Sequence, residues 1–178
     1  MKNKDNFFLK CIEREVYGNA KLSIVQRYKI RTFNPALNAV YLLRKFQLYS
    51  NKSGFINNFL AKNYYRCLFS KYNIYLRKTT KIGIGLRLPH PTGIVFGEWT
   101  NIGEDAWVYQ HVTFGSVKSE STSEGNQPQV GNGCRFYSGA CVIGGIHVAD
   151  KTTVGCNSIL SVDTELNSTY VGINRRIK

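Results

Sequence analysis

Histidine imidazoles are the side chains in this sequence best suited to acid–base chemistry near neutral pH, and the chain has three of them, His90, His111 and His147. An ordinary imidazole pKa of about 6.5 leaves the ring largely neutral at cytosolic pH, so that it can take a proton from an attacking hydroxyl. His90 follows Pro89 in the segment LPHPTG. Because an isolated histidine is more often structural than catalytic, the surrounding pattern has to decide its role.

The five cysteines offer no comparable chemistry. Their number is odd, no CxxC pair occurs, and their spacing matches no metal-binding motif. We interpret them as small buried hydrophobic residues and predict no metal site. They are Cys11, Cys67, Cys134, Cys141 and Cys156.

The residues that could position this chemistry lie in a repeat that fills the second half of the chain. Apolar residues recur there at a period of six, and a small residue often follows. This period is typical of a β-helix, in which three hexads make one coil and the apolar residue points inward. The fourteen repeat positions form three series: Leu76, Ile82, Leu88, Ile94; Phe96, Ile102, Val108, Phe114; and Val130, Phe136, Val142, Val148, Val154, Leu160.

Two interruptions of the repeat mark where a site could be built. The phase slips by two residues between Ile94 and Phe96, close to His90. The step from Phe114 to Val130 is 16 residues, which predicts a polar, exposed loop over residues 116–128.

The first half has a helical pattern. Asn34 and Pro35 predict a helix start, and that helix ends near Ser50. A second apolar stripe with helical spacing follows the Ser53–Gly54 break, and residues 5–30 favour one or two shorter helices. We therefore expect a basic α-helical domain over residues 1–74 and a β-helix domain over residues 75–178.

The excess of positive charge lies in the first half of the chain. Residues 1–80 hold 16 lysines and arginines against 3 acidic residues, whereas residues 81–178 hold 8 of each. This asymmetry favours an acidic partner, namely an anionic membrane surface, a phosphorylated or acidic glycan, or nucleic acid. The charged start of the chain and the lack of a long apolar run predict a cytoplasmic protein, placed if anywhere at the inner face of the plasma membrane.

The segment 82–116, IGIGLRLPHPTGIVFGEWTNIGEDAWVYQHVTFGS, resembles the serine acetyltransferase family, whose pattern includes IGxG, DHxTGIVxGE and QxVTLGG. The resemblance continues through GGIHVADKTTVGCNSIL to Val171–Arg176 and covers about 100 residues. The LPHPTGIV segment is more similar to relatives that act on capsular and exopolysaccharides. The resemblance implies an α+β chain with a left-handed parallel β-helix, a homotrimer, and an active site between neighbouring chains that uses acetyl-CoA.

The resemblance also implies roles for individual residues. His90 matches the catalytic general base, and the backbone N–H groups around Gly115 and Ser116 would support the acetyl thioester. Ser138, Thr153 and Cys156 match positions along the CoA channel. Arg176, with Arg175 and Lys178, either meets the CoA phosphates or is simply a basic tail.

Two departures from the family pattern concern the acceptor. Gln127, in NQPQVG, stands where the family has a second active-site histidine that holds the carboxylate of serine. Tyr75 stands where the family has the aspartate that orients the catalytic histidine, so a backbone carbonyl, the Tyr75 hydroxyl or Glu98 would have to orient His90. We therefore favour a polysaccharide sugar hydroxyl, or its lipid-linked or nucleotide-sugar precursor, as the acceptor.

Three alternatives remain at this stage. The first is a serine O-acetyltransferase of cysteine biosynthesis. The second is a β-helix carbonic anhydrase, although the histidines lie 21 and 36 residues apart and form no HxxxxH pair. The third is a non-catalytic basic scaffold for acidic glycan; the sequence carries no nucleic-acid-binding motif.

Overall fold

The computed structural model describes residues 2–117 and 124–172. The chain forms two compact units, Met1–Asn73 and Ile74–Lys178. The first unit is helical and the second is built of short parallel strands, so the expected order of a helical region and then a β-helix is confirmed.

Four helices make up the first unit, namely α1 (Lys2–Tyr17), α2 (Ile24–Phe33), α3 (Pro35–Ser50) and α4 (Phe55–Tyr72). Their ends follow local chemistry. The hydroxyl of Ser23 accepts from the backbone of Gln26 and the Gln26 side chain accepts from the backbone of Ser23, which closes a capping box on α2. Asn34 caps α3 ahead of Pro35, and Asn73 ends α4 in the left-handed conformation.

The core of the helical unit is centred on α3, which contacts the other three helices. One polar group lies inside this core: Arg44 of α3 pairs with Glu15 of α1 at 2.6 Å, with side-chain exposures of 0% and 1%. Gln47 completes the group by accepting from Arg44 at 2.9 Å. Such a pair tolerates loss of one partner poorly, because the remaining charge would stay buried.

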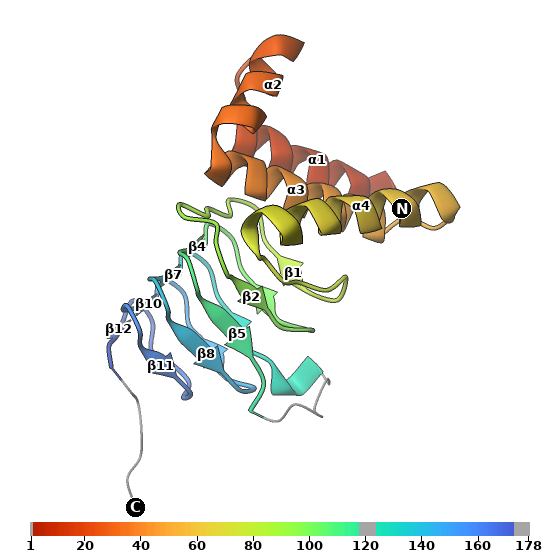
Figure 1. Ribbon diagram of the computed structural model, residues 1–178. Coiled ribbons are helices and arrows are strands. Elements are labelled where there is room, and N and C mark those ends of the chain that lie inside the picture. Colours follow the sequence, from red (N-terminus) through yellow and green to blue (C-terminus); the bar gives the residue numbers. More distant parts are fainter. Residues whose placement is uncertain (1, 118–123, 173–178) are drawn as a thin grey trace, which may run out of the picture. The chain divides into compact units, whose positions relative to one another are not determined.

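The second unit is a parallel β-helix with three faces, each a sheet of four short strands (Figure 1). We call the sheet β2-β5-β8-β11 face A, β1-β3-β6-β9 face B and β4-β7-β10-β12 face C. In chain order the strands are β1 (Lys81–Ile82), β2 (Val95–Phe96), β3 (Asn101–Ile102), β4 (Trp107–Val108), β5 (Thr113–Gly115), β6 (Gln129–Val130), β7 (Arg135–Phe136), β8 (Cys141–Ile143), β9 (His147–Val148), β10 (Thr153–Val154), β11 (Ile159–Leu160) and β12 (Thr169–Tyr170).

Each repeat of six residues in the sequence carries the chain from one face of the β-helix to the next. All fourteen repeat residues are buried, and in successive coils an inward apolar residue pairs in register with the inward apolar residue of the next coil. On face A, the rings of Phe96 and Phe114 stack with centroids 5.6 Å apart, and Phe136 of face C meets Phe114 edge-on at 4.9 Å. The inward residues therefore form one continuous apolar column.

Glycines at the corner between faces B and C let the coils approach closely. A Cβ added to Gly83 would lie 2.6 Å from the carbonyl carbon of Gly103, and one added to Gly103 would lie 2.5 Å from the carbonyl oxygen of Gly131. Because the obstructing atoms belong to the backbone, only glycine fits these positions at the present coil spacing.

No helix among the described residues is long and apolar enough to cross a bilayer. The described residues also contain no group of three or more histidine, cysteine, aspartate or glutamate side chains placed to hold a metal ion.

Candidate active site

His90 lies in an enlarged corner between faces C and A. The chain uses residues 89–94 to turn there, whereas the later C–A corners take only residues 109–112, 137–140 and 155–158. The two extra residues explain the phase slip between Ile94 and Phe96. The phase slip therefore coincides with the segment that carries the predicted general base.

Local chemistry fixes the shape of this corner. Pro89 and Pro91 flank His90 and restrict the backbone dihedrals around it. The backbone N–H of Thr92 donates to the carbonyl of His90 at 2.8 Å, which closes a tight turn. Gly93 has a φ of +65° and passes so close to the ring of His111 that a Cβ would lie 2.4 Å from His111 Nδ1. His90 is thus presented on a constrained turn.

The imidazole of His90 is exposed and packs against an aromatic side chain. The ring of Tyr109 lies 6.0 Å from it, centroid to centroid, and Tyr137 of the next coil stacks on Tyr109 at 5.1 Å. Within residues 2–117 and 124–172, no side chain or backbone group makes a hydrogen bond to the imidazole. An exposed imidazole in contact with an aromatic ring can accept a proton from a bound hydroxyl.

Sequence reasoning did not single out the two tyrosines. Their signal was nevertheless present, because Tyr109 and Tyr137 directly follow the inward residues Val108 and Phe136. At that place in the hexad most repeats carry a small residue. Two aromatic residues instead occupy this place in successive coils, on the edge that carries His90.

Tyr75 and Glu98, which the sequence offered as candidates to orient His90, meet a different partner. The Nε of Arg77 donates to the Tyr75 hydroxyl at 2.6 Å and lies 3.1 Å from Glu98 Oε1. The guanidinium also lies over the Tyr75 ring at 5.6 Å. The three residues form a polar cluster on face A and its border with face B, and sequence reasoning missed its central cation, Arg77.

Gly115 is the last residue of strand β5 and Ser116 follows it, at the start of the corner between faces A and B. The carbonyl of Gly115 accepts from the N–H of Gly144 at 2.8 Å. Among the described residues, a Cβ on Gly115 would meet only the side chains of Ile143 and Thr113, at 3.7 and 3.9 Å. The outer surface of the backbone is therefore open at Gly115, and a slender group such as a thioester could lie against it.

Gln127 is buried, with 5% of its surface exposed. The Oε1 of its side-chain amide accepts from the hydroxyl of Thr100 at 3.5 Å, and the same amide fills the space left by the missing side chain of Gly97. The expectation of an exposed loop over residues 116–128 is therefore wrong at Gln127 and Pro128, which are both buried. The reason is that the returning chain must rejoin face B, and the glutamine amide satisfies polar groups at that junction.

Of the residues matched to the CoA channel, Ser138 and Cys156 come together. The Ser138 hydroxyl lies 3.5 Å from Cys156 Sγ, both on the C–A edge that carries His90. Thr153 lies earlier in that coil, on strand β10 of face C, where it is half-buried. Arg175, Arg176 and Lys178 lie outside the described residues.

The candidate residues therefore occupy two different edges of one β-helix. His90, Ser138 and Cys156 lie on the C–A edge, which the Tyr109–Tyr137 stack also lines. Five other candidates lie on face A or the A–B edge, namely Tyr75, Glu98, Gly115, Ser116 and Gln127, whereas Thr153 lies on face C.

No protein-family model matches the chain. A serine acetyltransferase of Helicobacter pylori is 36% identical over 99 residues, which are 56% of this chain and 57% of that protein. A serine acetyltransferase of Staphylococcus aureus is 33% identical over 100 residues, 56% of this chain and 46% of that protein.

Solved structures extend the similarity to both units. A soybean serine acetyltransferase apoenzyme superposes with a TM-score of 0.76 at 19% identity, covering 98% of this chain and 70% of that one. A serine acetyltransferase in complex with CoA gives 0.72 at 21% identity, covering 99% and 72%.

In sequence and in fold, the chain is similar to serine acetyltransferases. The hexapeptide-repeat family expected from the motifs and the left-handed β-helix are thereby supported. The chain spans about half the length of the curated relatives it matches. The names of these relatives give no support to the capsule and exopolysaccharide branch that we favoured from the sequence.

Proposed function

We propose that the protein is an acetyl-CoA-dependent O-acetyltransferase in which His90 is the general base. The observation that carries the proposal is the exposed imidazole of His90 on an enlarged corner of a β-helix similar to that of serine acetyltransferases. The 36% identity to a curated serine acetyltransferase supports the same chemistry.

In the proposed reaction, His90 takes the proton of the acceptor hydroxyl as the oxygen attacks the acetyl carbon. Acetyl-CoA is a substrate whose thioester supplies the acetyl group. Backbone N–H groups near Gly115 and Ser116 stabilise the oxyanion, and the protonated His90 then returns its proton to the departing sulfur. Contact with Tyr109, 6.0 Å between centroids, limits the orientations open to the imidazole during both proton transfers.

The proposed enzyme is a homotrimer with its sites between chains. One chain presents His90 on the C–A edge and Gly115 on the A–B edge, so a site that needs both draws them from two neighbours. The open backbone at Gly115 and the short side chains of Ser138 and Cys156 fit a groove for the extended arm of CoA.

L-Serine is the acceptor that the curated relatives favour, since they are named serine acetyltransferases. This was our alternative from the sequence, and the comparisons support it better than the sugar hydroxyl that we preferred there. A sugar hydroxyl stays the second candidate because of one observation: Gln127 is uncharged and buried, so it supplies no cation for an amino-acid carboxylate. We place the enzyme in the cytoplasm, where acetyl-CoA is available, with contact to the inner membrane face as a further element of the proposal.

The proposal is tested by thiol release from acetyl-CoA with L-serine or the host's deacetylated surface polysaccharide as acceptor. We expect release with the wild type and a roughly hundred-fold or greater loss in His90→Ala. His147→Ala is the matched control, because His147 projects from face B and is exposed. Release with serine assigns the enzyme to cysteine synthesis, and release with glycan alone assigns it to polysaccharide modification. Unchanged release in His90→Ala would overturn the proposal.

A further inference from the structure

Helix α2 is oriented with its arginines inward and all of its large apolar side chains except Ile30 outward. None of its residues is buried, and the least exposed are Arg27, Ile30 and Arg31. The other large apolar side chains are far more exposed: Ile24 86%, Val25 62%, Tyr28 61% and Phe33 78%. This is the reverse of a surface helix that stabilises its own domain by burying an apolar stripe.

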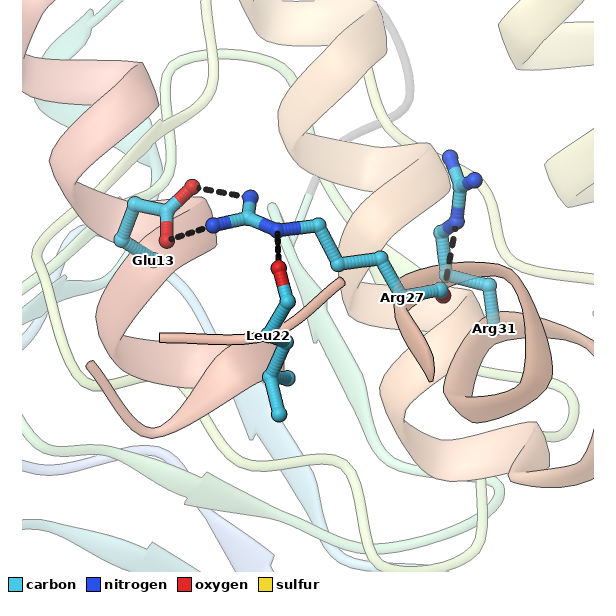
Figure 2. A network of polar contacts seen from close by, with 4 residues as sticks. All are labelled: Glu13, Leu22, Arg27 and Arg31. Atoms are coloured by element: carbon cyan, nitrogen blue, oxygen red, sulfur yellow. Dashed lines mark hydrogen bonds and ion pairs between the residues drawn. The ribbon is translucent and has the colours of Figure 1, made fainter. Parts of the chain in front are cut away.

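The arginines fix that orientation. Figure 2 shows the guanidinium of Arg27 meeting both carboxylate oxygens of Glu13 on α1, at 2.6 and 3.0 Å, while its Nε donates to the carbonyl of Leu22. Arg27 also lies over the ring of Tyr17 at 4.5 Å. In the next turn, Arg31 lies over the ring of Tyr41 of α3 at 4.6 Å. Polar and cation–π contacts thus hold α2 to its neighbours and leave its apolar side chains free to contact another surface.

The charge of the helical unit indicates what that surface is. Residues 1–73 contain fourteen lysines and arginines but only three carboxylates. Each carboxylate is already in an ion pair with a cation of the same unit: Asp5 with Lys52, Glu13 with Arg27 and Glu15 with Arg44. The unit therefore carries a net charge of +11 by composition. Lys21 lies just before α2 and Lys29 lies within it, and both are exposed.

Apolar side chains on a strongly cationic surface match an anionic lipid bilayer. Headgroup phosphates attract the cations over a distance of about one Debye length, and the apolar side chains then enter the boundary between headgroups and acyl chains. A second copy of the unit fits less well, because two helical units that each carry a net charge of +11 repel each other. Nucleic acid would satisfy the cations but would leave Ile24 and Val25 in water.

We infer that α2 is a membrane-docking element that inserts Ile24, Val25 and Tyr28 into the surface of an anionic bilayer while Arg27 and Arg31 hold the helix on the protein. This contact does not depend on the acetyl-transfer chemistry. It would place the enzyme against a surface where lipid-linked acceptors are held.

The test is co-sedimentation of the full chain with vesicles of phosphatidylcholine containing roughly one-third phosphatidylglycerol, against pure phosphatidylcholine. We expect binding to the anionic vesicles alone, and its loss at about 1 M salt, where charges are screened beyond roughly 3 Å. In the variant Ile24→Ser/Val25→Ser/Tyr28→Ser, the partition coefficient should fall roughly tenfold or more. Lys21→Ala/Lys29→Ala should weaken binding in low salt only.

The control Val162→Ser/Leu166→Ser/Val171→Ser removes three exposed apolar side chains from the β-helical unit. That unit is nearly neutral, because it contains ten lysines and arginines and eight carboxylates. This control should bind as the wild type does. Because none of the α2 side chains is buried, circular dichroism melting should show that the α2 variant folds.

Lack of binding to anionic vesicles, equal binding to neutral ones, or unchanged binding of the α2 variant would overturn the inference. A change of oligomeric state or of oligonucleotide binding in that variant, with lipid binding intact, would assign the face to a second copy or to nucleic acid instead. Thiol release measured without vesicles reports the proposed activity separately, so failure of one proposal leaves the other standing.

Discussion

His90 is presented by the backbone around it and by a tyrosine ring, and its described surroundings contain no carboxylate partner. Flanking prolines, the Thr92–His90 turn and the close approach of Gly93 to His111 fix the corner. Tyr109 then packs against the imidazole. At this scale the LPHPTG motif singled out His90 as the proposed base, a role that stays a prediction. The sequence could not predict that Arg77 engages Tyr75 and Glu98, since that depends on how successive coils align three side chains.

Burial of a cysteine thiol gives a residue-scale prediction about pH. Burial raises the pKa of the Cys134 thiol from 9.0 to about 11, so the folded chain keeps the proton where the unfolded chain releases it. Between pH 9 and 11 the unfolded state thus binds fewer protons, and stability must fall as pH rises. One such thiol contributes a slope of at most about 1.4 kcal/mol per pH unit.

Urea unfolding followed by fluorescence at pH 8, 9 and 10 measures this slope. The signal reports the β-helical unit, because the chain's two tryptophans, Trp99 and Trp107, both lie there. Cys134→Ala should flatten the decline above pH 9, whereas the exposed Cys156→Ala should leave it unchanged. A slope that is the same in wild type and Cys134→Ala would contradict the prediction.

Among the elements, the short strands and the tight corners together determine the geometry of the β-helix. The strands have only two or three residues each, so the stacked inward residues and the corner packing fix the coil spacing. The sequence predicted the strands well because period six leaves one inward residue for each face. It also predicted the starts of α3 and α4 through Asn34 and the Ser53–Gly54 break. It failed at Gln127–Pro128, where a polar composition indicated exposure but the chain had to re-enter face B.

Corner packing gives the element-scale prediction. Gly103→Ala should lower the free energy of unfolding by roughly 2 kcal/mol or more, because the new Cβ would press on backbone atoms of Gly131 that cannot rotate away. Gly125→Ala is the control, since a Cβ there meets nothing within 4 Å among the residues that the structure describes, and it should change stability by about 0.5 kcal/mol or less.

The same tryptophan-monitored urea unfolding, at neutral pH, compares the two variants. Equal stability of Gly103→Ala and wild type would mean that the coils can separate at this corner, and that the glycine ladder does not set their spacing.

For the whole molecule, charge and site residues are both unevenly distributed. The helical unit holds fourteen cations against three carboxylates, and the β-helical unit holds ten against eight. This asymmetry is visible in the sequence alone. The exposed apolar side chains of α2 are not visible in the sequence. Their exposure depends on the tertiary contacts of Arg27 with α1 and of Arg31 with α3, which turn Ile24 and Tyr28 outward.

In the proposed homotrimer the active site is divided between two edges of the β-helix. Its His90 and its Gly115 then come from different chains. Gly115→Val should fold, because a Cβ there makes only ordinary contacts, yet its branched side chain would fill the space proposed for the thioester. His90→Ala should fold as well, since the imidazole is exposed. Each variant alone should therefore be inactive for a different reason.

Co-expression of His90→Ala with Gly115→Val, followed by thiol release from acetyl-CoA, tests this claim most directly. Random mixed trimers would pair an intact His90 edge with an intact Gly115 edge at about one quarter of their interfaces, so we predict about one quarter of wild-type activity. Activity of the mixture no higher than that of the two variants measured apart would contradict a site shared between chains, and full activity of His90→Ala alone would contradict its role as the base.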